Sequence, residues 1–266
     1  MKLFFREVGD PAHPAIIILH GLFGSSDNWL TISKSIAAEG YHVYLIDQRN
    51  HGQSPRHEVF DYDSMAADLH EFIREHHIQQ PVLVGHSMGG KTVMQYVMNY
   101  RNEGDAAVAP SYSKVVVVDI APKFYPVHHG EILRGLGAIN LATLNNRNIA
   151  DETLKNYEPS ATVRQFLLKN LYRTAEGRFD WRINLPVIER EIHSVGEELN
   201  NPRTVTEPTL FIRGSESGYI ADNDLPGIQK LFPNSRVATI SDAGHWVQAE
   251  KPAEFVQTLI EFIKGQ

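Results

Sequence analysis

The feature that most constrains the fold is a G-x-S-x-G pattern at residues 85–89, which directly follows the apolar run Val82-Leu83-Val84. Such a run is typical of a buried strand, and residues 91–100 have the pattern of a helix. A strand, a sharp turn with a serine at its tip and a helix together hold the serine hydroxyl exposed at the top of a sheet. The glycines allow the backbones to approach closely at that turn. The pattern therefore predicts that Ser87 is a nucleophile and not part of an ordinary small-residue turn.

Short apolar runs alternate with amphipathic helical patterns along most of the chain. Several runs are β-branched and apolar on both faces, as in strands buried within a parallel sheet. This alternation predicts an α/β fold with helices on both faces of a mostly parallel central sheet. We expect residues 3–8 to add an antiparallel edge strand. The expected parallel strands are residues 15–19, 43–46, 81–84, 115–120, 209–212 and 236–240.

Residues 122–207 interrupt this alternation, with helical patterns and no convincing strand. We therefore predict a core made of residues 1–121 and 208–266, with a helical cap of residues 122–207 inserted after the strand that ends at Ile120. Because open α/β sheets bind ligands at the carboxyl ends of their strands, we expect the cap to cover the active site. A helical subdomain packed elsewhere is the alternative.

Composition narrows the classes of partner. The 266 residues carry a net charge of −7, which argues against binding to nucleic acid or to an anionic membrane surface. The absence of cysteine excludes disulfides and thiolate metal sites. No apolar stretch approaches the length of a membrane span, and charge interrupts the N-terminus too early for a secretory signal. We expect a cytoplasmic protein with a small-molecule substrate; the sequence does not indicate an oligomeric state.

A serine hydroxyl needs a general base, and the base needs a group that orients it. His245 follows the last expected strand, which is where a base belongs in the chain order Ser, acid, His. Backbone N–H groups must also bind the developing oxyanion. We assign these to Met88, directly after the nucleophile, and to Leu22 in the loop after the first central strand, with Phe23 as the second choice for that loop.

At this point the chain resembles the α/β-hydrolase superfamily over essentially its full length. The segments that carry the resemblance are His20-Gly21, residues 47–54, residues 85–91 and Gly244-His245-Trp246. More narrowly, the chain is similar to the YbfF-type bacterial esterases at residues 49–52, 90–91, 118–122 and 181–185. The resemblance implies hydrolysis of carboxylic esters, with acyl-CoA thioesters as a further substrate class.

The chain departs from the superfamily pattern at the acid. The position after Gly214 where an aspartate is usual holds Ser217, which cannot stabilise a cation by charge. We predict Asp119, at the end of the preceding strand, as the acid, because some branches of the superfamily use that position. Glu216 and Asp222 are the rivals, and a structural role for Asp119 in the loop that leads to the insertion is the alternative.

Together these residues predict a serine hydrolase, an esterase or thioesterase, that works through an acyl-enzyme without metal or organic cofactor. We expect Phe23, Tyr219 and Trp246 to line the substrate pocket. A C–C bond hydrolase or a perhydrolase would use the same triad and stays open, as does a non-catalytic ligand-binding receptor. Dehalogenases and epoxide hydrolases of this fold are disfavoured because they need an aspartate at position 87.

Three charged residues are expected to lie in contact with solvent. We expect Lys91, on the helix after Ser87, to lie at the surface. We expect Asp68 and Glu71 to belong to the solvated face of a helix at residues 63–77.

Overall fold

The computed structural model describes residues 1–100, 112–199 and 203–265. In these ranges a seven-stranded sheet has the order β1-β3-β2-β4-β5-β8-β9. β1 is antiparallel to β3 and every other pair is parallel, as expected from the sequence. The strands are β1 Phe5–Val8, β2 Ala15–Leu19, β3 His42–Ile46, β4 Val82–His86, β5 Lys114–Val118, β8 Thr209–Gly214 and β9 Ser235–Ile240.

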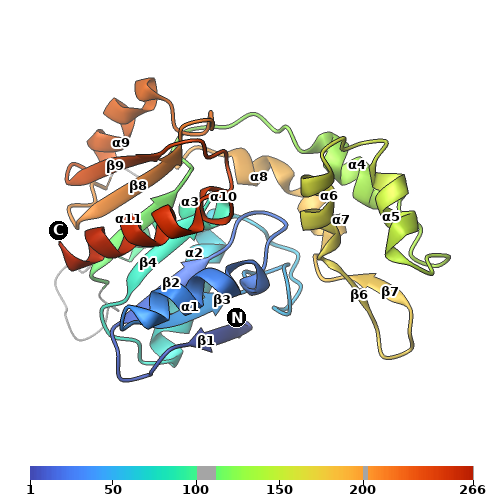
Figure 1. Cartoon of the computed structure of the whole chain (residues 1–266), viewed down its shortest axis with the longest axis horizontal. Helices are drawn as coiled ribbons and strands as arrows, with labels where there is room; N and C mark the ends of the chain where they lie inside the picture. The colour runs from blue at the N-terminus through green and yellow to red at the C-terminus, as the bar shows by residue number, and fades with distance from the viewer. Residues whose placement is uncertain (101–111, 200–202, 266) are drawn as a thin grey trace.

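Helices cover both faces of this sheet (Figure 1). Side chains of a strand point alternately to opposite faces, so Ile16 and Ile18 of β2 pack in one core with α1 and α11. Ile17 and Leu19 pack in the other core, with α2 and α3. The helices of the core are α1 Leu30–Ala38, α2 Tyr62–Glu75, α3 Met88–Asn99, α9 Leu225–Leu231, α10 Val247–Glu250 and α11 Pro252–Lys264, with short 3₁₀ turns η1 Ser26–Trp29 and η2 Asp222–Asp224.

The central strands differ slightly from their expected limits. β4 continues to His86, and β5 ends at Val118 rather than at residue 120. The earlier end has a local cause, since Asp119 adopts a φ of 50°, which takes the backbone out of the extended conformation that a strand needs. This turn directs the Asp119 carboxylate away from the strand and toward the edge of the sheet.

The segment between β5 and β8 lies to one side of the sheet (Figure 1). It contains α4 Gly130–Ala138, α5 Arg147–Leu154, α6 Ala161–Leu168, α7 Leu185–Arg190 and α8 Ile192–Gly196. The expectation that it holds no strand is wrong, because β6 Leu171–Arg173 and β7 Phe179–Trp181 form an antiparallel hairpin. Strands of three residues are too short to show an alternating pattern in the sequence.

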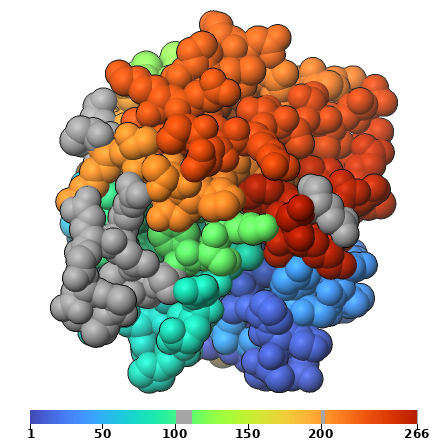
Figure 2. All heavy atoms as spheres, turned by 90° about the vertical axis from the view of Figure 1, so that its left-hand side faces the viewer, coloured from blue at the N-terminus to red at the C-terminus, as the bar shows by residue number. Residues whose placement is uncertain are grey.

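The parts of the chain before and after this insertion form one core. Seen from the side opposite the insertion, the blue atoms of the N-terminal part lie against the red atoms of the C-terminal part (Figure 2). Parallel pairing of β5 with β8 joins the two parts directly, with Val115 opposite Thr209. The insertion therefore leaves and re-enters the core at neighbouring strands.

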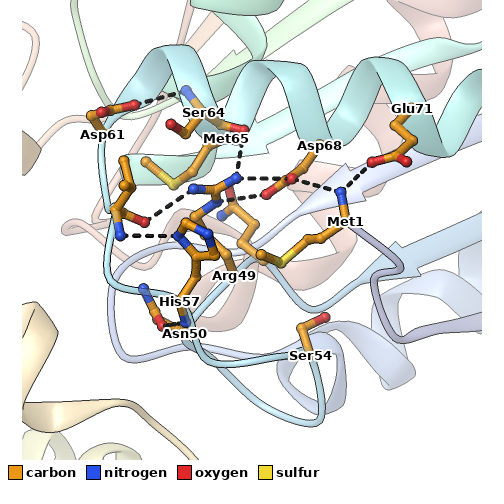
Figure 3. A network of polar contacts seen from close by, with 12 residues as sticks. Met1, Arg49, Asn50, Ser54, His57, Asp61, Ser64, Met65, Asp68 and Glu71 are labelled. Carbon is orange, nitrogen blue, oxygen red and sulfur yellow. Dashed lines mark hydrogen bonds and ion pairs between the residues drawn. The ribbon is translucent and has the colours of Figure 1, made fainter.

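A buried ion pair braces the loop after β3 against α2 (Figure 3). Arg49 donates from Nε and Nη2 to the two carboxylate oxygens of Asp68, at 2.6 and 2.9 Å. The remaining guanidinium donor groups reach the carbonyl oxygens of Val59 and Ser64. The expectation that Asp68 lies on a solvated face is wrong, because its side chain is only 5% exposed and pairs with a residue from a distant loop; Glu71 is exposed, as expected.

Removing the acid of this pair leaves the Arg49 guanidinium buried without its counter-charge. Asp68→Ala is therefore expected to lower the free energy of unfolding by about 3–5 kcal/mol, measured by urea denaturation. Glu75→Ala, an exposed acid on the same helix, is the matched control and should change it by less than about 0.5 kcal/mol. Equal effects of the two substitutions would show that the pair does not hold the loop.

Candidate active site

Ser87 stands at a strained turn between β4 and α3. Its backbone has φ 52° and ψ −118°, and its N–H donates to the carbonyl of Val118 at 2.9 Å. Such a conformation is unfavourable for a residue with a side chain and persists only where the surroundings enforce it. Gly89 is part of that enforcement, because a Cβ there would lie 2.5 and 2.6 Å from the carbonyl oxygens of Leu19 and His20. The glycine lets α3 pack directly on the end of β2.

Three side chains from distant parts of the chain meet at this turn. His245 Nε2 lies 3.0 Å from Ser87 Oγ, and His245 Nδ1 lies 2.8 Å from Asp119 Oδ2. An imidazole that bonds a carboxylate through Nδ1–H presents the lone pair of Nε2 to the serine. The arrangement can accept the hydroxyl proton of Ser87.

The Asp119 carboxylate is fully buried and has further partners. Ser217 Oγ donates a short hydrogen bond to Oδ2, and the N–H of Gly214 lies 3.4 Å from Oδ1. Ser217 thus occupies the place after β8 where the superfamily usually has its acid, and it binds the acid that comes from β5. Sequence reasoning noted the substitution but missed this contact, because only the fold shows that the two positions are adjacent.

The two rival acids lie elsewhere. Asp222 is 85% exposed and pairs with Arg213 Nη1 at 2.8 Å. Glu216 is exposed as well. The structure brings neither of them to the imidazole of His245.

The loop after β2 approaches Ser87 closely. A Cβ placed on Gly21 would lie 3.3 Å from Ser87 Cβ. In the described residues the N–H of Leu22 has no protein acceptor, and Met88, as the first residue of α3, has no intrahelical acceptor. The N–H of Phe23 is already used, since it donates to His51 Nε2 at 3.2 Å. Leu22 and Met88 are therefore the amides that are free to bind an oxyanion.

Two buried histidines hold this loop in their neutral form. His20 Nδ1 donates to the carbonyl of Gly21 while its Nε2 accepts from the N–H of Gln48. His51 Nδ1 likewise donates to a backbone carbonyl, and its Nε2 accepts from Phe23. Protonation would place an N–H group against a backbone N–H in both cases. Burial lowers the pKa of His20 to about 4, and burial together with the neighbouring His20 lowers the pKa of His51 to about 3.

A cavity of about 1080 Å³ opens at Ser87 between the core and the insertion. The three expected pocket residues, Phe23, Tyr219 and Trp246, all line this cavity. The ring of Tyr219 also stacks on His245 at a centroid distance of 3.9 Å. Phe166 from α6 contacts Trp246, with ring centroids 5.6 Å apart. The insertion therefore walls the cavity that leads to the serine.

The expectation that Lys91 lies at the surface is wrong. Its side chain is fully buried, and Nζ donates to the carbonyl oxygens of Gly196 and Glu197 at the end of α8. The ammonium also lies 4.9 Å from the ring centroid of Tyr125. Burial lowers the pKa of Lys91 to about 7, although the carboxylate of Glu197 opposes the shift. This burial could not be predicted from the sequence, because the segment that covers Lys91 belongs to the insertion.

No group of three or more histidine, cysteine, aspartate or glutamate side chains in the described residues could hold a metal ion. Among the same residues, no helix has the length and apolar character needed to cross a membrane.

The model of the family described as alpha/beta hydrolase fold matches residues 14–252. The chain belongs to this family. It is 34% identical to the esterase YbfF of Escherichia coli over 93% of this chain and 92% of that protein, and 36% identical to a zebrafish (Danio rerio) protein named sn-1-specific diacylglycerol lipase ABHD11 over 94% and 78%. A solved structure named marine microorganism esterase is 38% identical, covers 98% of this chain and 99% of its own, and superposes with a TM-score of 0.91. These findings confirm the resemblance to the α/β-hydrolase superfamily and to the YbfF-type esterases.

The two neutral histidines should make the folded protein less stable as the pH falls. Because the folded-state pKa values of His20 and His51 lie below the ordinary 6.5, the unfolded chain binds more protons than the folded one between about pH 6.5 and 4. Their contribution to stability is present above pH 6.5 and is lost as the pH falls, by roughly 1.4 kcal/mol per unit for each histidine. Thermal unfolding between about pH 7.5 and 4.5 should show this fall.

Two variants separate these histidines from the general effect of acid. His51→Gln keeps an acceptor for the N–H of Phe23 but does not titrate, so it should flatten the fall in melting temperature. His13→Gln, at an exposed position, should leave the fall unchanged. A His51→Gln profile parallel to that of the unmodified protein would contradict the assignment.

Proposed function

We propose that the protein hydrolyses carboxylic esters through an acyl-enzyme formed on Ser87. The observation that carries the proposal is the position of His245, whose two ring nitrogens lie within hydrogen-bond distance of Ser87 Oγ and Asp119 Oδ2. The esterase and lipase names of the relatives agree with this activity. The substrate is a small-molecule ester, and the chemistry calls for no metal or organic cofactor.

Acylation begins when Ser87 Oγ attacks the carbonyl carbon and His245 Nε2 takes the hydroxyl proton. Asp119 keeps the imidazole in the tautomer that leaves Nε2 unprotonated, and it stabilises the imidazolium that forms. The carbonyl oxygen becomes an oxyanion, which the N–H groups of Leu22 and Met88 bind. Preorganised donors of this kind contribute about 3 kcal/mol each to lowering the barrier.

The intermediate then collapses. The bond between the carbonyl carbon and the leaving oxygen breaks, and the imidazolium of His245 gives its proton to the departing alcohol. His245 then takes a proton from a water molecule, which attacks the acyl-enzyme, and gives that proton to Ser87 Oγ. This step releases the carboxylic acid and restores Ser87. A thioester would follow the same path with a thiol as leaving group, so acyl-CoA thioesters remain a candidate substrate class.

We assign residues 122–207 the role of a cap. Its side chains, including Ile132, Val163 and Phe166, line the cavity at Ser87. A cap that keeps bulk water out of the site, while admitting the one water that cleaves the acyl-enzyme, strengthens the electrostatic contribution of the oxyanion donors. It also determines which esters reach the serine.

Covalent labelling tests the nucleophile. A fluorophosphonate probe should label the purified protein once, and Ser87→Ala should abolish both labelling and hydrolysis of p-nitrophenyl acetate. Ser35→Ala, an exposed serine on α1, is the serine control, since it keeps Ser87 and should still be labelled. Equal labelling of Ser87→Ala would refute the proposal.

The acid is tested by isosteric amides. Asp119→Asn should lower kcat by about 10⁴-fold, because an amide cannot stabilise the imidazolium and favours the wrong tautomer. Glu216→Gln, the rival acid in the neighbouring loop, should keep kcat within about twofold. The assignment is wrong if Glu216→Gln is the variant that loses activity. Circular dichroism of both variants checks that they fold.

A further inference from the structure

Ser87 lies between two cavities of very different size. One is the cavity of about 1080 Å³ already described, and the other has a volume of about 30 Å³. Both reach Ser87 and Leu22, but only the large one is lined by His245. Met88 lines only the small one. The two cavities therefore meet at Ser87, with Met88 on the side of the small cavity and His245 on the side of the large one.

An ester has two arms, the acyl group and the alcohol. The position of His245, which protonates the leaving alcohol, determines which arm enters which cavity. In the tetrahedral intermediate the leaving oxygen must face His245 Nε2 to receive its proton, while the oxyanion faces the amides of Leu22 and Met88. The leaving group then extends into the cavity that His245 lines. The acyl group takes the remaining direction, which leads into the small cavity.

We propose that the small cavity is the acyl subsite and that it limits the enzyme to esters of two- or three-carbon acids with large apolar alcohols. The proposal rests on the proposed function, because it needs the acyl-enzyme on Ser87. It identifies the substrate by the sizes of its two arms.

The volume of the small cavity sets the limit. A space of about 30 Å³ holds roughly two water molecules, since one water needs about 10–15 Å³ by this measure. A methyl or ethyl group fits such a space, whereas a longer chain must displace the wall. The wall includes Tyr62, Ile120, Tyr125, Ile192 and Val195, and the exposed residues 126–128 line the same cavity.

Buried polar contacts hold this wall in place. Lys91 binds the carbonyl oxygens of Gly196 and Glu197, and its ammonium lies against the rings of Tyr125 and Tyr62, 4.9 and 5.6 Å from their centroids. Tyr62 Oη donates to the carbonyl of Val195 at 2.7 Å. Movement of the wall would break several of these bonds in a buried setting, so Lys91 acts as a positioning residue for the acyl subsite.

Tyr125 is held from a second direction as well. Its N–H donates to the carbonyl of Gly196 at 2.8 Å, and its hydroxyl donates to the carbonyl of Tyr219 at 2.6 Å. Tyr219 in turn stacks on His245. The wall of the acyl subsite is thereby connected to the base, and its rigidity also keeps the imidazole in place.

The large cavity suits the other arm. Its lining from the insertion includes Ile132, Val163, Phe166 and Leu167, and the core adds Trp246. An apolar alcohol buries surface against these side chains. Binding energy from this remote arm should raise kcat/KM as the alcohol grows.

Two ester series test the assignment on the purified protein. With p-nitrophenol as the constant leaving group, kcat/KM should fall by about tenfold or more between the propionate and the hexanoate, because the added methylenes have no room. With acetate as the constant acid, kcat/KM should rise from the methyl ester to the octyl ester. A hexanoate hydrolysed as fast as the acetate, or acetates that slow as the alcohol grows, would overturn the proposal.

Substitutions in the two cavities separate the subsites. Val195→Ala enlarges the small cavity and keeps the backbone carbonyl that Tyr62 binds, so the ratio of hexanoate to acetate hydrolysis should rise about tenfold. Phe166→Ala, the matched change in the large cavity, should alter the preference for the alcohol and leave the acyl ratio as it was. An unchanged acyl ratio in Val195→Ala, or a changed one in Phe166→Ala, would contradict the assignment.

Lys91→Met tests what holds the wall, since it keeps the length of the side chain but cannot bind the two carbonyls. It should raise kcat/KM for the hexanoate relative to the acetate, mainly through KM, and Lys91→Arg should restore part of the selectivity. A Lys91→Met protein with the original acyl ratio would exclude a positioning role. Should no variant and no ester show hydrolysis, and Ser87 remain unlabelled, the proposed function itself fails; hydrolysis with no limit on acyl length refutes only the subsite.

Discussion

The hydrogen bond between Asp119 Oδ2 and His245 Nδ1 is the contact on which the geometry of the site depends. It joins residues 126 positions apart and involves a fully buried carboxylate. Without this bond, neither the tautomer of the imidazole nor the orientation of Nε2 toward Ser87 would be fixed. Burial strengthens the bond, and the contacts of Ser217 and Gly214 satisfy the rest of the carboxylate.

Strand order explains how such distant residues meet. β4, β5, β8 and β9 are neighbours in that order, and they run parallel, so the loops after them lie at one edge of the sheet. Ser87 follows β4, Asp119 follows β5, Ser217 follows β8 and His245 follows β9. Left-handed backbone at Ser87 and Asp119 ends the first two strands abruptly and directs their side chains into the site. Residues of the insertion, such as Phe166, line the cavity that opens at this edge.

Much of this arrangement could be predicted from the sequence, because the signals were local. The G-x-S-x-G turn between an apolar run and a helix predicts the position of Ser87, and the position of His245 after the last strand follows from the chain order. Asp119 could be proposed because Ser217 occupies the position where the superfamily usually has its acid, and some branches of the superfamily use the end of the preceding strand instead. Burial of Asp68 and Lys91 could not be predicted, because the partners of both come from distant segments: the loop after β3 for Asp68, and the end of the insertion for Lys91. The hairpin of β6 and β7 could not be predicted, because each strand has only three residues.

The most direct test of the account is a crystal structure of the protein inactivated with ethyl p-nitrophenyl methylphosphonate. We expect phosphorus bonded to Ser87 Oγ, with a phosphoryl oxygen about 2.7–3.1 Å from the backbone nitrogens of Leu22 and Met88. The ethoxy group should face His245 and the methyl group should enter the small cavity. An adduct on another residue, or a phosphoryl oxygen that contacts neither amide, would contradict the account.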